Sequence, residues 1–368
     1  MRLEQHIYTS GKKGFATVAQ TPGITKDEQI KLENHSLYIL PGSFLYKEGV
    51  STPTKYIFYP LSEKRFVLGR AIYIGKDNLG RPGNYLFHNL IISKDELEEP
   101  SFNPAKLIKM IEENGLFRTS PPEKPLDVIN LPLDKEIEFK IPPIPQDLIL
   151  ALLYYCFSYK SLKAPLLLVG QDKDCLNFLG WLYTLLPYSL KENLSFDTYS
   201  YGANLGLKIM GIPKESDFYQ TISYSLKIDL LTYDYNLNPE IKEPSKPILA
   251  LTEMIATGRE EEIASMYSAE YSLKMGDYER FRERYIAFSK DVKELIYTSH
   301  KERILNYIID KKDLELLQII INLLFEKAED RKGFIAMLVG SIGGIKSKRE
   351  EASKPKPSFF GRLLGERG

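Results

Sequence analysis

The fold of the first third of the chain is decided by the stretch Phe66-Val67-Leu68-Gly69-Arg70-Ala71-Ile72-Tyr73-Ile74 and, after a polar turn, by Tyr85-Leu86-Phe87-His88-Asn89-Leu90-Ile91-Ile92. Both stretches are rich in β-branched and aromatic residues, which suit the pleated, half-buried surface of a sheet. The turn between them, from Gly75 to Asn84, contains the glycine, proline, aspartate and asparagine residues that reverse a chain. The sequence therefore predicts a strand, a turn and a strand here.

Segments on both sides extend this β pattern. Gln5 to Ser10 and Phe15 to Gln20 flank a short glycine-containing turn and predict a hairpin. The other elements expected before residue 140 are a charged helix at 26–34, a strand at 55–59, and a helix that Asn103 caps, that Pro104 begins and that Asn114-Gly115 ends. We therefore expect a β-rich N-terminal domain over residues 1–140.

Proline-rich segments divide the rest of the chain. Residues 120–145 contain seven prolines, which remove backbone donors and disfavour both helices and central strands. Helical and strand patterns then alternate, which is typical of a small α/β unit. A second proline-containing segment lies at 239–247. The predicted fold class is α+β multidomain, with the β-rich domain followed by an α/β middle domain at 141–240 and an all-α C-terminal domain at 248–340.

The last residues, 341–368, read as a mobile, basic tail. Its Phe359, Phe360, Leu363 and Leu364 occupy one side of a short helix. A tail has no core of its own in which to bury them, so they are candidates for docking onto a partner protein. The alternative is that the tail folds back onto its own helical domain.

Composition excludes several classes of protein. The chain has 49 Lys and Arg against 49 Asp and Glu, whereas a dedicated nucleic-acid binder usually carries a basic excess. Only two cysteines occur among 368 residues, which rules out a disulfide framework. No apolar run is long enough to span a membrane, and no signal peptide follows Met1. We expect a cytoplasmic protein without stable membrane association.

Searches for motifs of metal binding, nucleophilic catalysis and phosphate binding found no match. The strand and glycine at 166–170 lead into a helix, but the acidic first turn of that helix would repel a phosphate. We therefore expect no metal, no cofactor and no catalytic residue, and the sequence leaves the question of enzymatic activity open.

A group of polar residues around the central turn is the best candidate for a ligand or partner site. Asp77, Arg81, Asn84 and His88 lie within twelve residues, and His6 could join them if its strand pairs beside that of His88, although no spacing demands it. Arginine can clamp a carboxylate or phosphate, and histidine can act as an acid or a base. Alternatively, these residues only build a tight turn, in which Asp77 pairs with Arg81.

Several segments resemble the type 2 N-terminal domain of bacterial GTPase-associated protein 1, namely residues 6–11, 14–19, 21–23, 69–73 and 80–88. The segments 165–169, 185–187 and 194–199 resemble the middle domain of the same family. The resemblance extends over about residues 5–215 and not into the helical remainder or the tail.

The resemblance implies a component of a multi-protein bacterial system that includes a GTPase and acts in conflict with phage or in a regulated response. It carries over no catalytic residue. We therefore expect a non-enzymatic adaptor that binds partner proteins, among them a GTPase, and not nucleic acid. The alternative is an enzyme, or a sensor of a small ligand or nucleotide, that uses His6, Asp77, Arg81, Asn84 and His88.

Overall fold

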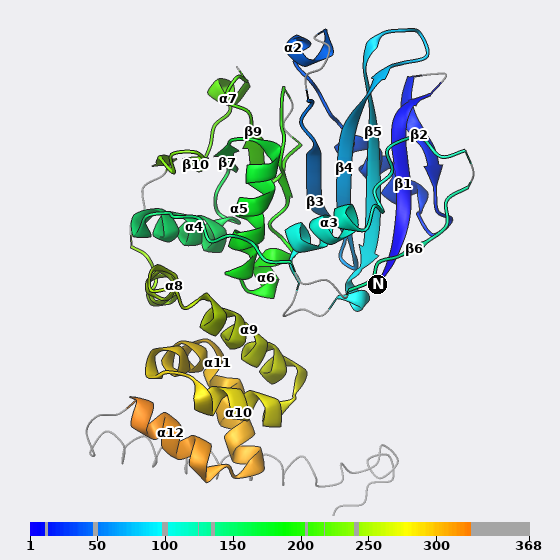
Figure 1. The fold of residues 1–368 in the computed structure, drawn as a ribbon. Helices are drawn as coiled ribbons and strands as arrows, with labels where there is room; N and C mark the ends of the chain where they lie inside the picture. The colour runs from blue at the N-terminus through cyan, green and yellow to red at the C-terminus, as the bar shows by residue number, and fades with distance from the viewer. Residues whose placement is uncertain are drawn as a thin grey trace, which may run out of the picture. The chain divides into compact units, whose positions relative to one another are not determined.

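In the computed structural model the chain forms two compact units, Met1–Ser268 and Ala269–Gly368 (Figure 1). The structure describes residues 1–11, 14–46, 51–97, 102–123, 125–133, 137–202, 205–216, 218–238 and 243–324. The tail at 341–368, with Phe359, Phe360, Leu363 and Leu364, lies outside the described residues, so its predicted docking role stays a prediction.

The N-terminal part of the first unit is an antiparallel sheet. Its strands lie in the order β3 (Lys55–Ser62), β4 (Arg65–Lys76), β5 (Pro82–Ser93), β1 (Arg2–Gly11) and β2 (Gly14–Gln20), and β6 (Ile129–Asn130) pairs with the start of β1. This arrangement confirms the β-rich N-terminal region, the opening hairpin and the strand-turn-strand pattern that the sequence predicted.

The same sheet continues into a mixed part beyond residue 140. There the order is β11 (Tyr235–Leu237), β10 (Leu226–Asp229), β7 (Leu166–Val169), β9 (Ile209–Ile212) and β8 (Phe196–Asp197). β7 is parallel to both β9 and β10, and β8 is parallel to β9 but antiparallel to β3. The described strands therefore form one sheet of eleven, which combines the β-rich region with an α/β region.

Helices lie between the strands of this sheet along the chain, and the described C-terminal region is helical, as predicted. The helices before residue 240 are α1 (Lys26–His35), α2 (Gly42–Leu45), the 3-10 helix η1 (Lys94–Glu96), α3 (Pro104–Glu113), α4 (Gln146–Ser158), α5 (Asp172–Thr184), α6 (Tyr188–Lys191) and α7 (Phe218–Thr221). Those that follow are α8 (Lys246–Ala256), α9 (Glu260–Met275), α10 (Tyr278–Ala287), α11 (Lys290–Lys311) and α12 (Leu314–Leu324). The predicted mixed fold class is confirmed.

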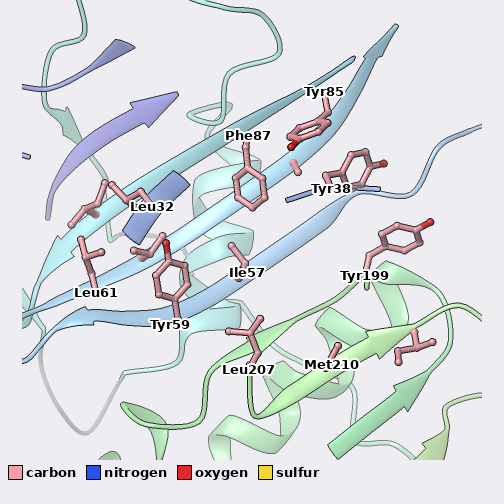
Figure 2. Packing of buried hydrophobic residues seen from close by; sticks show 14 of the residues in the cluster. Leu32, Tyr38, Ile57, Tyr59, Leu61, Tyr85, Phe87, Tyr199, Leu207 and Met210 are labelled. Atoms are coloured by element: carbon pink, nitrogen blue, oxygen red, sulfur yellow. The ribbon is translucent and has the colours of Figure 1, made fainter. Parts of the chain in front are cut away.

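One face of the sheet, which we call the α1 face, carries a continuous apolar core (Figure 2). Ile57, Tyr59 and Phe87 of the antiparallel strands pack there with Leu32 of α1 and with Met210 of β9. Residues from before and after residue 140 thus exclude water from the same core, and burying each large apolar side chain contributes about 1.5–3 kcal/mol.

The opposite face, the α3 face, is covered by helices α3 and α5. Phe58 of β3 lies with its ring 5.8 Å from that of Phe102 and 6.3 Å from that of Tyr183 in α5. Asn103 caps α3 by accepting from the N–H of Lys106, which confirms the predicted start of this helix.

The two parts of the sheet meet where β3 pairs with β8. The N–H of Thr198 donates to the carbonyl of Tyr56, and the N–H of Tyr56 donates to the hydroxyl of Thr198, both at 2.9 Å. Beside them, Lys55 Nζ lies 2.9 Å from Asp197 Oδ2, and these side chains are 4% and 0% exposed. A fully buried ion pair therefore lies at the junction.

Strand β8, which pairs with β3 at this junction, is short and comprises only Phe196–Asp197. The hydroxyl of Ser200 donates to Asp197 Oδ2 at 2.6 Å. The backbone N–H of Ser200 still donates to the carbonyl of Gly211 in β9, so the chain stays beside the sheet although the regular strand ends at Asp197.

The all-α region predicted for 248–340 consists, as far as residue 324, of separate helices. Gly258 and Gly276 take positive φ values of 73° and 79° where α8 and α9 end. In the second unit, Arg282 of α10 bonds to Asp313 at 2.6 Å. Helix α11 is kinked at His300, whose Nε2 lies 3.2 Å from Glu270 Oε1. Among the described helices, none has the length and apolar character needed to cross a membrane.

Candidate functional site

Three of the predicted site residues belong to the β4–β5 turn. The Asp77 carboxylate accepts from the backbone N–H groups of Leu79 and Arg81, both at 2.9 Å, and from Arg81 Nε at 2.8 Å. These bonds, those from the Arg81 backbone first, lower the pKa of Asp77. Gly80 and Gly83 take φ values of 75° and 101°, which only glycine adopts without strain.

Asn84 lies at the base of the same turn. Its Oδ1 accepts from the hydroxyl of Thr9 at 3.3 Å, and its Nδ2 donates to the carbonyl of Lys76 at 3.4 Å. The contacts of Asp77, Arg81 and Asn84 are therefore those of the tight turn that the sequence offered as the alternative. Leu79 lies at the tip with 76% of its surface exposed.

His6 lies on the α1 face within a chain of hydrogen bonds. Asn89 Nδ2 lies 3.1 Å from His6 Nδ1, His6 Nε2 lies 2.8 Å from the hydroxyl of Thr17, and that hydroxyl donates to Glu33 at 2.5 Å. Asn89 also donates to the hydroxyl of Ser36 at 3.0 Å. These hydrogen bonds connect β1, β2 and β5 to α1, and both ring nitrogens of His6 have partners.

Two titratable groups belong to this chain of hydrogen bonds, His6 and Glu33, and the pKa of each is lowered for a different reason. Burial lowers the pKa of His6 from 6.5 to about 4, against the opposing effect of the Glu33 charge. Partial burial by itself would raise the pKa of Glu33, but hydrogen bonds from Thr17 and Gln29 outweigh it and the pKa is lowered. His6 is therefore neutral near pH 7 and takes part as a neutral hydrogen-bonding group.

His88 lies on the α3 face, fully buried. Its Nδ1 accepts the backbone N–H of Arg118 at 3.0 Å, and its ring meets that of Phe117 edge-on at 5.8 Å. Burial first, and then the nearby charges of Arg118 and Arg70, lower the pKa of His88 well below its usual value. Because Nδ1 is an acceptor, the neutral ring carries its hydrogen on Nε2.

Arg70 lies opposite His88 in the β4–β5 register, and its side chain is 9% exposed. It donates to Glu112 of α3 at 2.9 Å and to the carbonyls of Phe117 and Arg118 at 3.2 and 3.0 Å. The guanidinium carbon lies 5.0 Å from the centre of the Phe117 ring.

Glu112 also accepts from the hydroxyl of Tyr56 at 2.7 Å. We call Arg70, His88 and Arg118, with Glu112 and Tyr56 at the rim, the His88 cluster.

The structure does not bring the two histidines together. In the β1–β5 register Ile7 lies opposite His88, and His6 lies opposite Asn89. Since successive side chains of a strand point to opposite faces, His6 and His88 face opposite sides of the sheet. One small ligand cannot contact both, and neither lies in the turn that holds Asp77 and Arg81.

Sequence reasoning missed Arg70, Arg118, Glu112 and Tyr56. The available signal was a single charged residue, Arg70, inside the otherwise apolar stretch from Phe66 to Ile74. A charge in a buried strand needs a partner, but the pattern does not reveal which one.

Other candidate chemistry is accounted for by local contacts. At the start of α5, Asp172 accepts the N–H of Thr54 at 3.0 Å, so a carboxylate of the chain itself lies where a phosphate would have to bind. Cys156 and Cys175 are both buried free thiols, and burial raises the pKa of Cys156 to about 12. The described residues contain no group of three or more His, Cys, Asp and Glu placed to hold a metal ion.

A comparison with known protein families relates the N-terminal region of the chain to one of them. Residues 2–134 match the family model of GTPase-associated protein 1, N-terminal domain type 2. This match confirms the predicted resemblance for the antiparallel part of the sheet and for α3. It ends before α4, so the likeness of residues 165–199 to the middle domain of that family stays a prediction. A comparison with curated proteins found no match.

Proposed function

We propose that the protein is a non-enzymatic, cytoplasmic adaptor of a bacterial GTPase-linked multi-protein system, and that it binds partner proteins, one of them a GTPase. The observation that carries this proposal is the match of residues 2–134 to the type 2 N-terminal domain of GTPase-associated protein 1. The proposed adaptor presents modules at 1–140, 141–240 and 248–340, and it uses the tail at 341–368 as an additional docking segment.

The β4–β5 turn supports a role in contacting proteins. Asp77 holds the turn through backbone and side-chain bonds, so the tip keeps one shape before any partner arrives. A preorganised tip loses little conformational entropy on binding. Leu79 and the 67% exposed side chain of Arg81 project from it. We therefore place a partner contact at residues 77–84.

Co-purification tests the adaptor role. The full chain is expressed with the products of neighbouring genes, and binding to the encoded GTPase is measured by calorimetry with GDP and with a non-hydrolysable GTP analogue. The expected result is a complex in at least one nucleotide state. Absence of binding by the GTPase and by every neighbouring gene product, in all states, contradicts the proposal.

A matched pair of variants then tests the turn. Leu79→Ser removes the apolar tip of the β4–β5 hairpin, and Leu231→Ser removes that of the β10–β11 hairpin, where Leu231 is 79% exposed. Each leucine N–H donates to an aspartate two residues earlier at 2.9 Å, so the two turns are built alike. We expect Leu79→Ser to weaken partner binding and Leu231→Ser to leave it unchanged. Equal effects would remove the turn from the proposed interface but leave the adaptor role standing.

A further inference from the structure

The His88 cluster contains buried hydrogen-bond donors without acceptors. Within the described residues, Nε of Arg70, Nε of Arg118 and Nε2 of His88 are buried and have no hydrogen-bond partner. The tautomer set by the Arg118 backbone makes His88 Nε2 an N–H group, so all three atoms are donors. Buried donors are almost always satisfied in native proteins, so three unmatched donors in one cluster point to an acceptor that the described residues do not supply.

The charges of the cluster indicate which acceptor suits it. Two guanidinium groups, those of Arg70 and Arg118, stand against one carboxylate, that of Glu112. Glu112 already accepts from Arg70 Nη1 and from the hydroxyl of Tyr56, and 39% of its side chain is exposed to solvent, which screens it. Burial is the main cause of the lowered pKa of the His88 ring, and the charges of Arg118 and Arg70 lower it further. An anionic acceptor therefore fits better than a neutral one.

We propose that the His88 cluster is a binding site for a small oxyanion, or for the carboxylate or phosphate group of a larger ligand, held by N–H groups of Arg70, His88 and Arg118. Arginine supplies planar, charge-assisted donors that match such groups. Phe117 stacks on Arg70 and fixes the orientation of its guanidinium. The partly buried Arg118 and the 39% exposed side chain of Glu112 lie where the cluster meets the surface, at the end of α3.

An ordered water is the competing occupant. Gln5 lies on the same face as His88, and its Oε1 is also buried without a partner in the described residues. A water that accepts from His88 and donates to Gln5 would satisfy two of these atoms without any anion. Because water leaves the positive excess uncompensated, the two occupants predict different responses to anions.

The test uses the full chain labelled with ¹⁵N-histidine and titrated with sulfate, whose charge is constant near neutral pH. Phosphate and acetate form parallel titrations that separate phosphate-like from carboxylate-like ligands, and sodium chloride at equal ionic strength is the blank. We expect a saturable shift of the His88 ring resonances. His6, which is buried on the opposite face with both nitrogens bonded, is the internal reference and should not move.

Variants assign the effect to the cluster. Arg118→Met and His88→Phe should each weaken anion affinity about tenfold or more, the loss expected for one charge-assisted bond. Arg280→Met, at an exposed arginine of α10 in the second unit, is the control and should bind as the unmodified chain does. Arg118 is half-exposed, so its variant folds even if His88→Phe does not.

Two results would overturn the proposal. One is a folded chain that shows no saturable response to any of the three anions, with a crystal structure holding an ordered water only. The other is anion binding that Arg118→Met leaves unchanged, which would place the anion elsewhere.

Discussion

Breaking the buried ion pair between Lys55 and Asp197 tests whether the two parts of the sheet fold as one. Both side chains are excluded from water, and Asp197 Oδ1 has no partner among the described residues. Removing one member of such a pair leaves the other charge buried and costs about 3–5 kcal/mol. We therefore expect Asp197→Ala and Lys55→Met each to lower the free energy of unfolding by about this amount.

Replacing both charges should cost far less than either single change. The double variant Lys55→Met/Asp197→Leu, made together with Ser200→Ala so that no hydroxyl loses its acceptor, removes both desolvation penalties and puts apolar groups of similar volume at the junction. It should lie within about 1 kcal/mol of the Ser200→Ala chain, or above it, since the pair leaves one carboxylate oxygen unsatisfied. The thermodynamic cycle should then show a coupling of several kcal/mol between the two positions.

Urea unfolding followed by the fluorescence of Trp181 measures these effects. Trp181 is the single tryptophan of the chain, lies in α5 and is 2% exposed, so its signal reports on the first unit. Glu192→Ala, which breaks the partly exposed pair with Lys94, is the control and should cost less than about 1 kcal/mol. Single variants that cost as little as this control, or a double variant as unstable as the sum of the singles, would refute the reasoning.

Three further predictions follow from particular contacts. Gly69→Ala places a Cβ atom 2.6 Å from both Asn89 Oδ1 and Ile57 Cγ2, so it should lower the free energy of unfolding of the first unit by about 1–3 kcal/mol in urea. An unchanged unfolding midpoint would show that the strands shift freely to admit the methyl group. Between pH 6.5 and about pH 4 the unfolded chain binds a proton at His6 that the folded chain does not, so His6 should lower stability by about 3 kcal/mol as the pH is lowered through this range. His88, whose pKa is also lowered, acts in the same direction, so His6→Asn should remove only the share of His6 from the pH profile of urea unfolding. Asp77→Ala removes the acceptor for the backbone N–H groups of Leu79 and Arg81, so the hydrogen exchange of these two amides should accelerate while that of β5 stays the same. Equal protection of the two amides in the variant and in the unmodified chain would contradict the conclusion that Asp77 holds the turn.

The sequence by itself determined the features that depend on short stretches of chain. The strand-turn-strand from Phe66 to Ile92 follows from β-branched and aromatic residues around a glycine-rich turn, and the start of α3 follows from Asn103 and Pro104. Asp77 and Arg81 are four residues apart, so their pairing in the turn was one of the two alternatives that local chemistry offered. Local propensities and caps act within a few residues and can be read directly.

Only the tertiary structure decided how distant segments meet. Pairing of their strands could have brought His6 and His88 together, and the strands do pair, but a register of Ile7 with His88 turns the two rings to opposite faces. The meeting of Arg70, His88 and Arg118 spans 48 residues, and the pairing of β3 with β8 spans about 140. A one-residue change of register would exchange the faces, and no local pattern fixes that register because it is set by the packing of the whole sheet.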